Sequence, residues 1–149
     1  MNWTIFNIVF YLTVFIAPDE KKEKKKRIFI SFAIEDIDYR KHLVAQAKNE
    51  RSPFYFIDMS VKKAWEQHEW QEMCRKKIKR CDGMIVLLSK NTWKSSGSRW
   101  EIKCAVEEKI PVIGMHIFKK DKGAIPPELP TNKVIEWTWD NIEKELNKM

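Results

Sequence analysis

The stretch that decides the fold is residues 84–89, which read MIVLLS and carry no charge. Six residues of this kind are typical of a central strand in a parallel sheet, because helices cover both faces of such a sheet. Four further short runs are rich in β-branched and aromatic residues, and they span residues 27–32, 54–58, 112–117 and 133–137. Helical patterns or polar loops separate the five runs, which predicts an α/β domain.

Apolar residues between these runs recur at helical spacing and predict four helices, the third beginning near Ser98 and the fourth after Asp140. The residues expected on the buried faces of the first three are Tyr39, Leu43, Val44 and Ala47; Trp70, Met73, Cys74, Ile78 and Cys81; and Ile102, Ala105 and Val106. Right-handed crossovers between parallel neighbours then predict a flavodoxin-like strand order, 2-1-3-4-5, with helices on both faces of the sheet.

Composition limits the classes of function. A chain of 149 residues with 44% hydrophobic content has material for one domain with a core, and none for a second. The three cysteines form no CxxC pair, so we expect reduced thiols in a cytosol and no metal site. The net charge of +7 is concentrated in residues 21–27, which hold six cations and one anion. This cluster lacks interleaved aromatic residues, so we do not expect nucleic-acid binding.

The N-terminal residues differ in composition from the rest of the chain. We predict three parts: an apolar segment over residues 1–18, a charged linker over 19–26, and the domain over 27–149. Residues 3–17 are nearly all apolar, although 15 residues fall short of the ~20 that span a bilayer comfortably. One hypothesis is a short membrane anchor that keeps the domain in the cytoplasm, because lysines follow it. The alternatives are a helix used in self-assembly and a mis-assigned start codon.

Polar side chains gather where the predicted strands end. Ligands bind at the carboxyl ends of strands in open parallel sheets, so these positions are the candidates for a site. They include Ser31 and Phe32, Glu35 and Asp36, Asp58 and Ser60, Ser89, and His116. There is no G-x-x-x-x-G-K-S/T loop and no G-x-G-x-x-G after the first strand, which argues against a P-loop or a Rossmann cofactor site.

Two of the candidate carboxylates have a simpler interpretation as helix caps. The spacing Ser98-x-x-Glu101 fits a capping box, in which Glu101 only caps its own helix. Asp36 stands where the N-cap of the first helix belongs. His116 reads as an ordinary histidine at a strand end. Residues 119–132 form a long polar loop that is either a lid or a surface connection.

Two stretches of the sequence resemble bacterial TIR and TIR-like domains. They are RIFISFAIEDIDYR (residues 27–40) and LLSKNTWKSSGSRWEIKCAVEEKIPVIGMHI (residues 87–117). The similarity is greatest to the TIR-like proteins of the Thoeris anti-phage system. The resemblance implies a flavodoxin-like enzyme that uses NAD as its substrate, needs no cofactor, and makes a cyclic ADP-ribose signal for a separate effector. It also implies self-association or contact with other TIR domains.

The resemblance also implies roles for particular residues. The family's catalytic glutamate maps to Glu101, and its Ser-Phe pair and following acidic residue map to Ser31, Phe32 and Asp36. With these, Ser89 and Trp100 are the expected substrate-binding residues, and Phe32 and Trp100 are expected to wall the pocket. One departure concerns Trp100, because the family's tryptophan stands four residues before the glutamate. The alternative function is a non-catalytic TIR adaptor or scaffold.

Overall fold

The structure is a computed structural model that describes residues 24–59, 67–130 and 132–149. Its centre is a five-stranded parallel sheet in the order β2-β1-β3-β4-β5. The strands are β1 (Lys26–Ser31), β2 (Phe54–Ile57), β3 (Gly83–Leu88), β4 (Val112–His116) and β5 (Val134–Glu136). The predicted fold class and strand order are therefore confirmed, and each predicted strand is found within two residues of its expected bounds.

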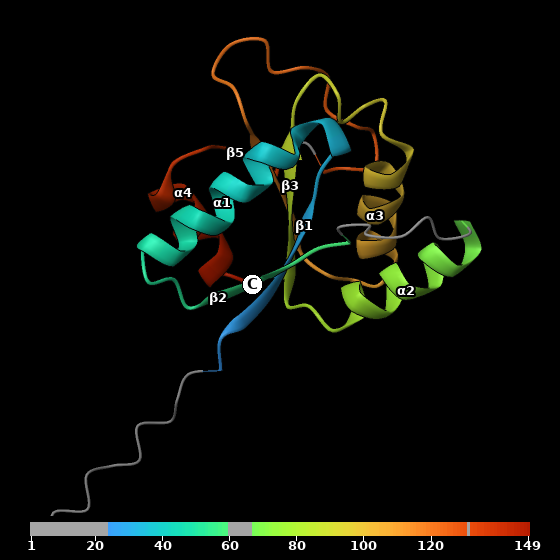
Figure 1. The fold of residues 1–149 in the computed structure, drawn as a ribbon, viewed down its shortest axis with the longest axis horizontal. Helices are drawn as coiled ribbons and strands as arrows, with labels where there is room; N and C mark the ends of the chain where they lie inside the picture. Colours follow the sequence, from blue (N-terminus) through green and yellow to red (C-terminus); the bar gives the residue numbers. More distant parts are fainter. Residues whose placement is uncertain (1–23, 60–66, 131) are drawn as a thin grey trace, which may run out of the picture.

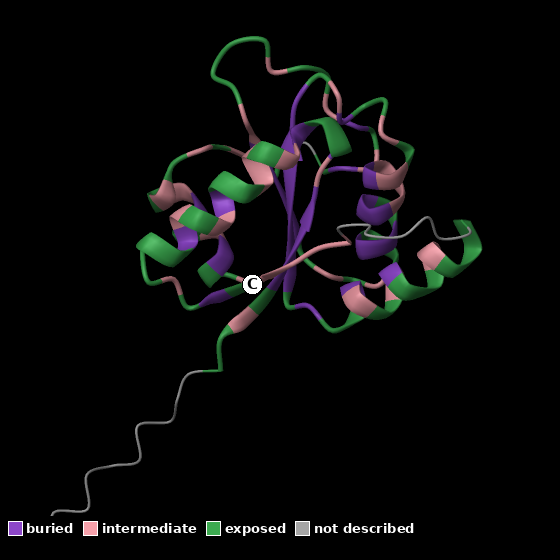
Figure 2. Ribbon diagram, in the orientation of Figure 1, coloured by how far each residue is buried: buried purple, intermediate pink, exposed green. Residues whose placement is uncertain are grey.

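Helices cover both faces of the sheet (Figure 1). The four helices are α1 (Ile37–Asn49), α2 (Gln67–Lys79), α3 (Ser96–Glu107) and α4 (Trp139–Asn147), and a short 3-10 helix η1 (Ile34–Asp36) precedes α1. In Figure 1, α1 and α4 lie on one side of the strands and α2 and α3 on the other. All six residues of β3 are buried, as expected for a strand covered on both faces (Figure 2).

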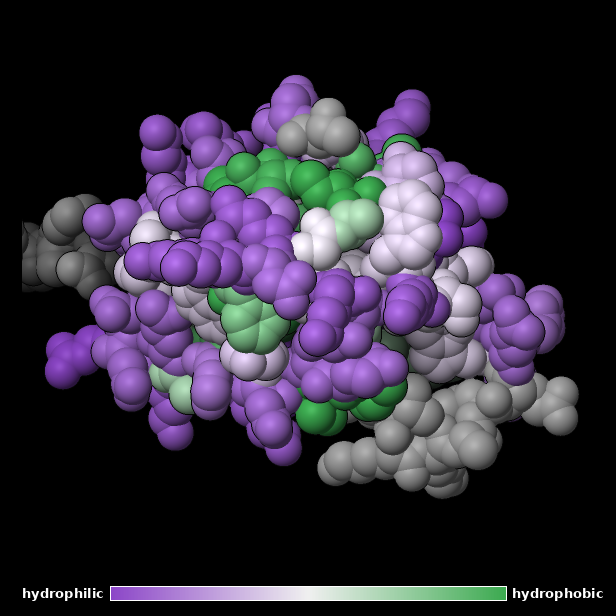
Figure 3. All heavy atoms as spheres, turned by 90° about the horizontal axis from the view of Figure 1, so that it is seen from above, coloured by the Kyte–Doolittle hydropathy of each residue, from purple (hydrophilic) through white to green (hydrophobic). Residues whose placement is uncertain are grey.

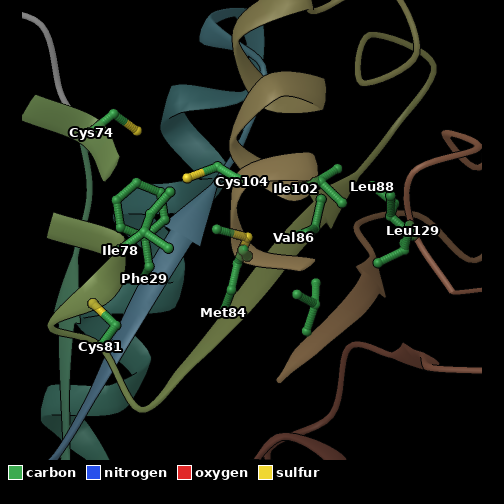
Figure 4. Close-up of a cluster of buried hydrophobic side chains, with 12 residues drawn as sticks. Phe29, Cys74, Ile78, Cys81, Met84, Val86, Leu88, Ile102, Cys104 and Leu129 are labelled. Atoms are coloured by element: carbon green, nitrogen blue, oxygen red, sulfur yellow. The ribbon is translucent and has the colours of Figure 1, made fainter. Parts of the chain in front are cut away.

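Alternation along the strands gives each face its own core. On the side of α2 and α3, the core contains Ile78 and Ile102 of the helices together with the strand residues Phe29, Met84, Val86 and Leu88 (Figure 4). The neighbouring residues Ile28, Ile30, Ile85 and Leu87 pack with Leu43 and Ile142 on the side of α1 and α4. The rigid sheet between these two cores fixes the positions of the loops at its carboxyl edge, where the predicted site lies.

Some predicted helix contacts are wrong. Val106 is 48% exposed and Met73 is 37% exposed, although both were expected on buried faces. Cys81 is buried but lies two residues beyond the end of α2. The third helix begins at Ser96 because the hydroxyl of Ser95 accepts a hydrogen bond from the Ser98 N–H at 3.2 Å. All three cysteines are free and buried.

The loop after β4 packs closely against the domain. Leu129 is buried in the core on the side of α3, and Arg99 of α3 binds the carboxylate of Glu128 at 2.8 Å. Gly123 has a φ of +74°, and a Cβ there would lie 2.6 Å from the backbone nitrogen of Lys90. The described part of this loop therefore contacts the β3–α3 connection closely.

The predicted apolar N-terminal segment and most of the charged linker lie outside the described residues. Within the described ranges, no helix is long and apolar enough to cross a membrane. The membrane anchor and the three-part division of the chain stay predictions.

Candidate functional site

Glu101 does not cap its own helix. Ser95 is the N-cap of α3, so Glu101 lies in the second turn of the helix, beyond the positions that a capping box uses. Its side chain is buried, and Oε1 accepts a hydrogen bond from the Ser31 hydroxyl at 3.2 Å. The Cys74 thiol lies 3.9 Å from Oε2. The capping-box interpretation is wrong because Ser95, three residues upstream of Ser98, takes the cap instead.

Two serine hydroxyls support the carboxyl group. The Oγ atoms of Ser31 and Ser98 lie 2.8 Å apart, and both residues are buried. Because Ser31 ends β1 and Ser98 belongs to the first turn of α3, this contact joins the strand to the helix. A network of buried hydrogen bonds gives its members one defined arrangement. The carboxyl of Glu101 is therefore held from the sheet and from the preceding turn of its own helix.

A pocket of about 240 Å³ opens beside Glu101 at the carboxyl edge of the sheet. Its apolar wall consists of Phe32, Ile34, Met59 and Trp70, and its polar wall of Ser95, Gly97, Ser98 and Glu101. Figure 3 looks onto this edge of the molecule, where apolar surface lies among hydrophilic side chains. A pocket with one apolar wall and a few convergent polar groups has the general character of a ligand site.

Burial raises the pKa of the Glu101 carboxyl well above the ordinary value of 4.5. The negative charge of Asp58 raises the pKa further, while the hydrogen bonds from Ser31 and Cys74 lower it. Burial likewise raises the pKa of the Cys74 thiol, and the charge of Glu101 adds to that effect. A positively charged group entering the pocket would favour the ionised form of Glu101.

Asp36 and Ser89 form a second cluster, and neither lines the pocket. Asp36 is at the N-cap position of α1 but makes no capping hydrogen bond with its side chain. Instead its carboxylate accepts hydrogen bonds from the Ser89 hydroxyl at 2.6 Å and from Asn91 Nδ2 at 3.1 Å. These contacts connect the start of α1 to the end of β3. A role for Asp36 and Ser89 in substrate binding stays a prediction.

Trp100, which was expected to wall the pocket, is not among the residues that line it, and its role in substrate binding stays a prediction. Trp100 instead lies on the side of α3 that faces α2. There its ring contacts Trp70, with the ring centroids 5.4 Å apart. Trp70 lines the pocket in its place.

Sequence reasoning missed several pocket residues. Trp70 was expected only as a packing residue, and Ile34 and Gly97 carried no recognisable signal. Met59 could have been found, because it lies two residues after the end of β2 and therefore at the same edge of the sheet as Ser31.

His116 ends β4 and does not line the pocket. Its Nδ1 atom is buried without a hydrogen-bond partner among the described residues. Burial lowers the pKa of its imidazole, and the positive charge of Lys122 adds to this effect. The interpretation of His116 as an ordinary, hydrogen-bonded histidine therefore does not hold for this atom.

The fold and the pocket define a TIR-like α/β domain. The family model for the TIR-like domain of Thoeris protein ThsB matches residues 29–122, which is more than half of the chain. The chain belongs to this family. The match includes Ser31, Phe32, Trp70 and Glu101, so the pocket lies within the family domain. No curated protein matches the chain.

Two solved structures give weaker similarities. One is the structure of the TIR domains of the activated Roq1 resistosome, which directly recognizes the pathogen effector XopQ. It aligns with a TM-score of 0.45 and 22% sequence identity over 60% of this chain. This chain covers 56% of that one. The 2-desoxiribosyltransferase from Leishmania mexicana aligns with a TM-score of 0.48 and 15% identity, covering 70% of this chain and 81% of that one. Neither similarity bears on function.

Proposed function

We propose that this protein is an NAD-consuming enzyme of anti-phage defence that cleaves the nicotinamide–ribose bond, with Glu101 as the catalytic residue. The observation that carries the proposal is the position of Glu101: its buried carboxyl lines a pocket and accepts a hydrogen bond from Ser31. The pocket lies at the carboxyl edge of a parallel sheet, where such folds bind ligands. Membership of the Thoeris TIR-like family supports NAD as the substrate.

The reaction requires stabilisation of a positive charge on the ribose. When the bond between ribose C1′ and the ring nitrogen breaks, its electron pair stays with the ring and neutral nicotinamide leaves. The ribose then carries the charge of an oxocarbenium-like ion, as in glycoside hydrolysis. A nucleophile on the same molecule captures C1′ and loses a proton, which gives a cyclic ADP-ribose. Capture by water gives linear ADP-ribose.

Glu101 stabilises the developing charge as a carboxylate. The hydrogen bond from Ser31 holds it in place before the reaction, so little reorganisation is needed at the moment of bond cleavage. Nicotinamide is a good leaving group without protonation, so the mechanism requires no general acid. The apolar wall formed by Phe32, Ile34, Met59 and Trp70 keeps water from C1′ and thereby favours cyclisation over hydrolysis.

The pocket is small for a whole dinucleotide. Its volume of about 240 Å³ is below the roughly 300–1,000 Å³ of drug-sized ligand sites. It suits the nicotinamide and its ribose, which leaves the diphosphate and the adenosine to lie outside it. The reacting bond is then inside the pocket beside Glu101.

The proposal is tested by NAD turnover in two matched variants of the full chain. Glu101→Gln keeps the shape of the side chain but cannot become negative, and we expect it to lower kcat roughly 100- to 1000-fold. Glu143→Gln makes the same change on the exposed side of α4, far in the fold from the pocket, and should turn over NAD as the unchanged chain does. Purified protein and phage-infected cells are both assayed, in case a trigger is needed.

The same experiment decides between enzyme and adaptor. An adaptor would bind other TIR domains without consuming NAD, and Glu101→Gln would leave that binding unchanged. In the enzyme proposal, the cyclic product diffuses to a separate effector, and self-association serves to assemble the active form. Equal NAD turnover in the Glu101→Gln and Glu143→Gln proteins would remove Glu101 from the mechanism.

A further inference from the structure

Trp70 and Glu101 line the same pocket from two different helices, α2 and α3. The position of the indole ring is fixed by its distance to Gly97. A Cβ built on Gly97 would lie 3.8 Å from Cη2 and 3.9 Å from Cζ2 of Trp70, which is ordinary van der Waals contact. The six-membered part of the indole ring therefore lies against the first turn of α3.

Gly97 also relates the ring to the carboxyl group. Gly97 and Glu101 are four residues apart on one helix, so they are neighbours on the same helix face. The indole ring that lies against Gly97 is consequently about one helical turn, roughly 5–6 Å, from the start of the Glu101 side chain. Because Gly97 has no side chain, no Gly97 atom beyond its backbone lies between the Trp70 ring and the pocket.

A series of contacts holds Trp70 in this position. Its ring meets Trp100 edge to face, with an interplanar angle of 61°. The Arg75 guanidinium lies over the Trp100 ring, 5.5 Å from its centroid. Glu107 and Glu108 bind Arg75 at 2.9 Å and 2.6 Å. The ring of Trp70 is thus supported before any ligand enters the pocket.

The chemistry of the proposed substrate fits this arrangement. The nicotinamide ring of NAD is flat and positively charged, and an indole is the side chain that binds a flat cation best. If Glu101 acts at ribose C1′, the ring bonded to C1′ must lie within a few ångströms of its carboxyl. The geometry points to Trp70 as the residue that contacts the nicotinamide ring, with Trp100 as the positioning residue behind it. This inference rests on the proposed function.

The first test compares NAD with ADP-ribose, which lacks the nicotinamide ring. Both ligands are titrated by calorimetry into the full-length Glu101→Gln protein, which should bind NAD without cleaving it, and into its Trp70→Leu and Trp70→Phe derivatives. Removing an aromatic stacking partner typically weakens binding roughly 5- to 150-fold. We expect a loss of this size for NAD in the Trp70→Leu protein, no loss for ADP-ribose, and NAD affinity largely restored by phenylalanine.

A matched control uses another tryptophan. Trp93 is 43% exposed, does not line the pocket, and is covered by the Arg99 guanidinium at 5.1 Å. Trp93→Leu should leave the affinities for NAD and ADP-ribose unchanged. An equal loss for both ligands in the Trp70→Leu protein would show a merely structural role, and an unchanged NAD affinity would show no contact at all. Either result overturns the inference.

A second measurement does not depend on the stability of the leucine variant. The Glu101→Gln protein is labelled with 5-fluorotryptophan, and the signal of residue 70 is identified as the one missing from the Trp70→Phe spectrum. This signal should shift with NAD and not with ADP-ribose, and identical responses to the two ligands would contradict the inference. Failure of the proposed function is seen separately, as absent NAD turnover or as NAD turnover that does not depend on Glu101.

Discussion

At the scale of single residues, the proposed catalysis depends on a carboxyl group that is costly to bury. Glu101 is 5% exposed, and burial raises its pKa well above 4.5. Perturbed pKa values cluster at functional sites, where a buried and prepositioned carboxylate acts more strongly than a solvated one. The hydrogen bond from Ser31 reduces the cost without removing it. Glu101 therefore has the energetic character expected of a catalytic residue.

This cost predicts that Glu101→Gln stabilises the protein. The pKa of Glu101 is higher in the folded chain than in the unfolded chain, so the stability linked to its proton is complete below about pH 4.5 and is lost as the pH rises through the raised pKa. The variant should unfold with a free energy roughly 1–3 kcal/mol higher at neutral pH. Urea unfolding from pH 4 to 8 measures the difference, which should grow with pH. A difference independent of pH would contradict the assignment.

A second prediction at this scale concerns Ser31→Ala. Because the Ser31 hydroxyl lowers the pKa of Glu101, its removal should raise that pKa further and leave less carboxylate at neutral pH. We expect kcat/KM for NAD to fall about tenfold, the equivalent of one hydrogen bond to a charged group, and its acid limb to move to higher pH. The pH profile of kcat/KM provides the test. A loss of activity with an unmoved acid limb would mean that Ser31 acts only on the fold.

At the scale of the elements, the site is assembled where β1, α2 and α3 meet. Ser31 comes from the end of β1, Trp70 and Cys74 from α2, and Glu101 from α3. The strands were predictable from local runs, since each buried strand is a short apolar segment in the sequence. The helix start was not, because Ser95 and Ser98 offer two competing caps and only the structure shows that Ser95 is used. The pocket role of Trp70 depends on how α2 packs against α3, which no local pattern contains.

The loop after β4 provides a prediction for the elements. Gly123 adopts a positive φ of 74°, and an added Cβ would lie 2.6 Å from the Lys90 backbone nitrogen. Gly123→Ala should therefore lower the free energy of unfolding by roughly 1–3 kcal/mol. Gly97→Ala is the matched control, because its Cβ would meet Trp70 at an ordinary 3.8 Å. Chemical denaturation measures the free energy of unfolding of both variants and of the unchanged chain. If Gly123→Ala is as stable as the unchanged chain, the loop moves freely like a lid.

At the scale of the whole molecule, the sheet divides the interior into two cores, and the pocket lies at one end of it. The overall fold could be predicted because short apolar strand runs alternate along the chain with helical patterns, in the order that a parallel α/β sheet requires. Glu101 could be proposed as a catalytic residue only because the sequence resembles the TIR family, since its spacing from Ser98 favoured a helix cap. What sequence could not provide is the long-range contact between Ser31 and Glu101, 70 positions apart.

The packing of the core on the side of α2 and α3, which contains all three cysteines, predicts the reactivity of the thiols. Cys74, Cys81 and Cys104 are all buried, and burial raises the pKa of Cys81 and of Cys104 to about 11. Thiolates are the reactive form, so all three should react slowly at neutral pH. Alkylation followed by mass spectrometry should find no modified cysteine in the folded chain and three in guanidinium. Rapid labelling of one cysteine without unfolding would show that its part of the core is open.

The most direct test of the central claim is the release of nicotinamide from NAD in a single turnover, with enzyme in excess and the products followed by proton NMR. We expect the unchanged chain to release one nicotinamide for each ADP-ribose product formed. We expect the Glu101→Gln protein to release nicotinamide roughly 100- to 1000-fold more slowly. Nicotinamide release at the same rate from both proteins would contradict a catalytic role of Glu101.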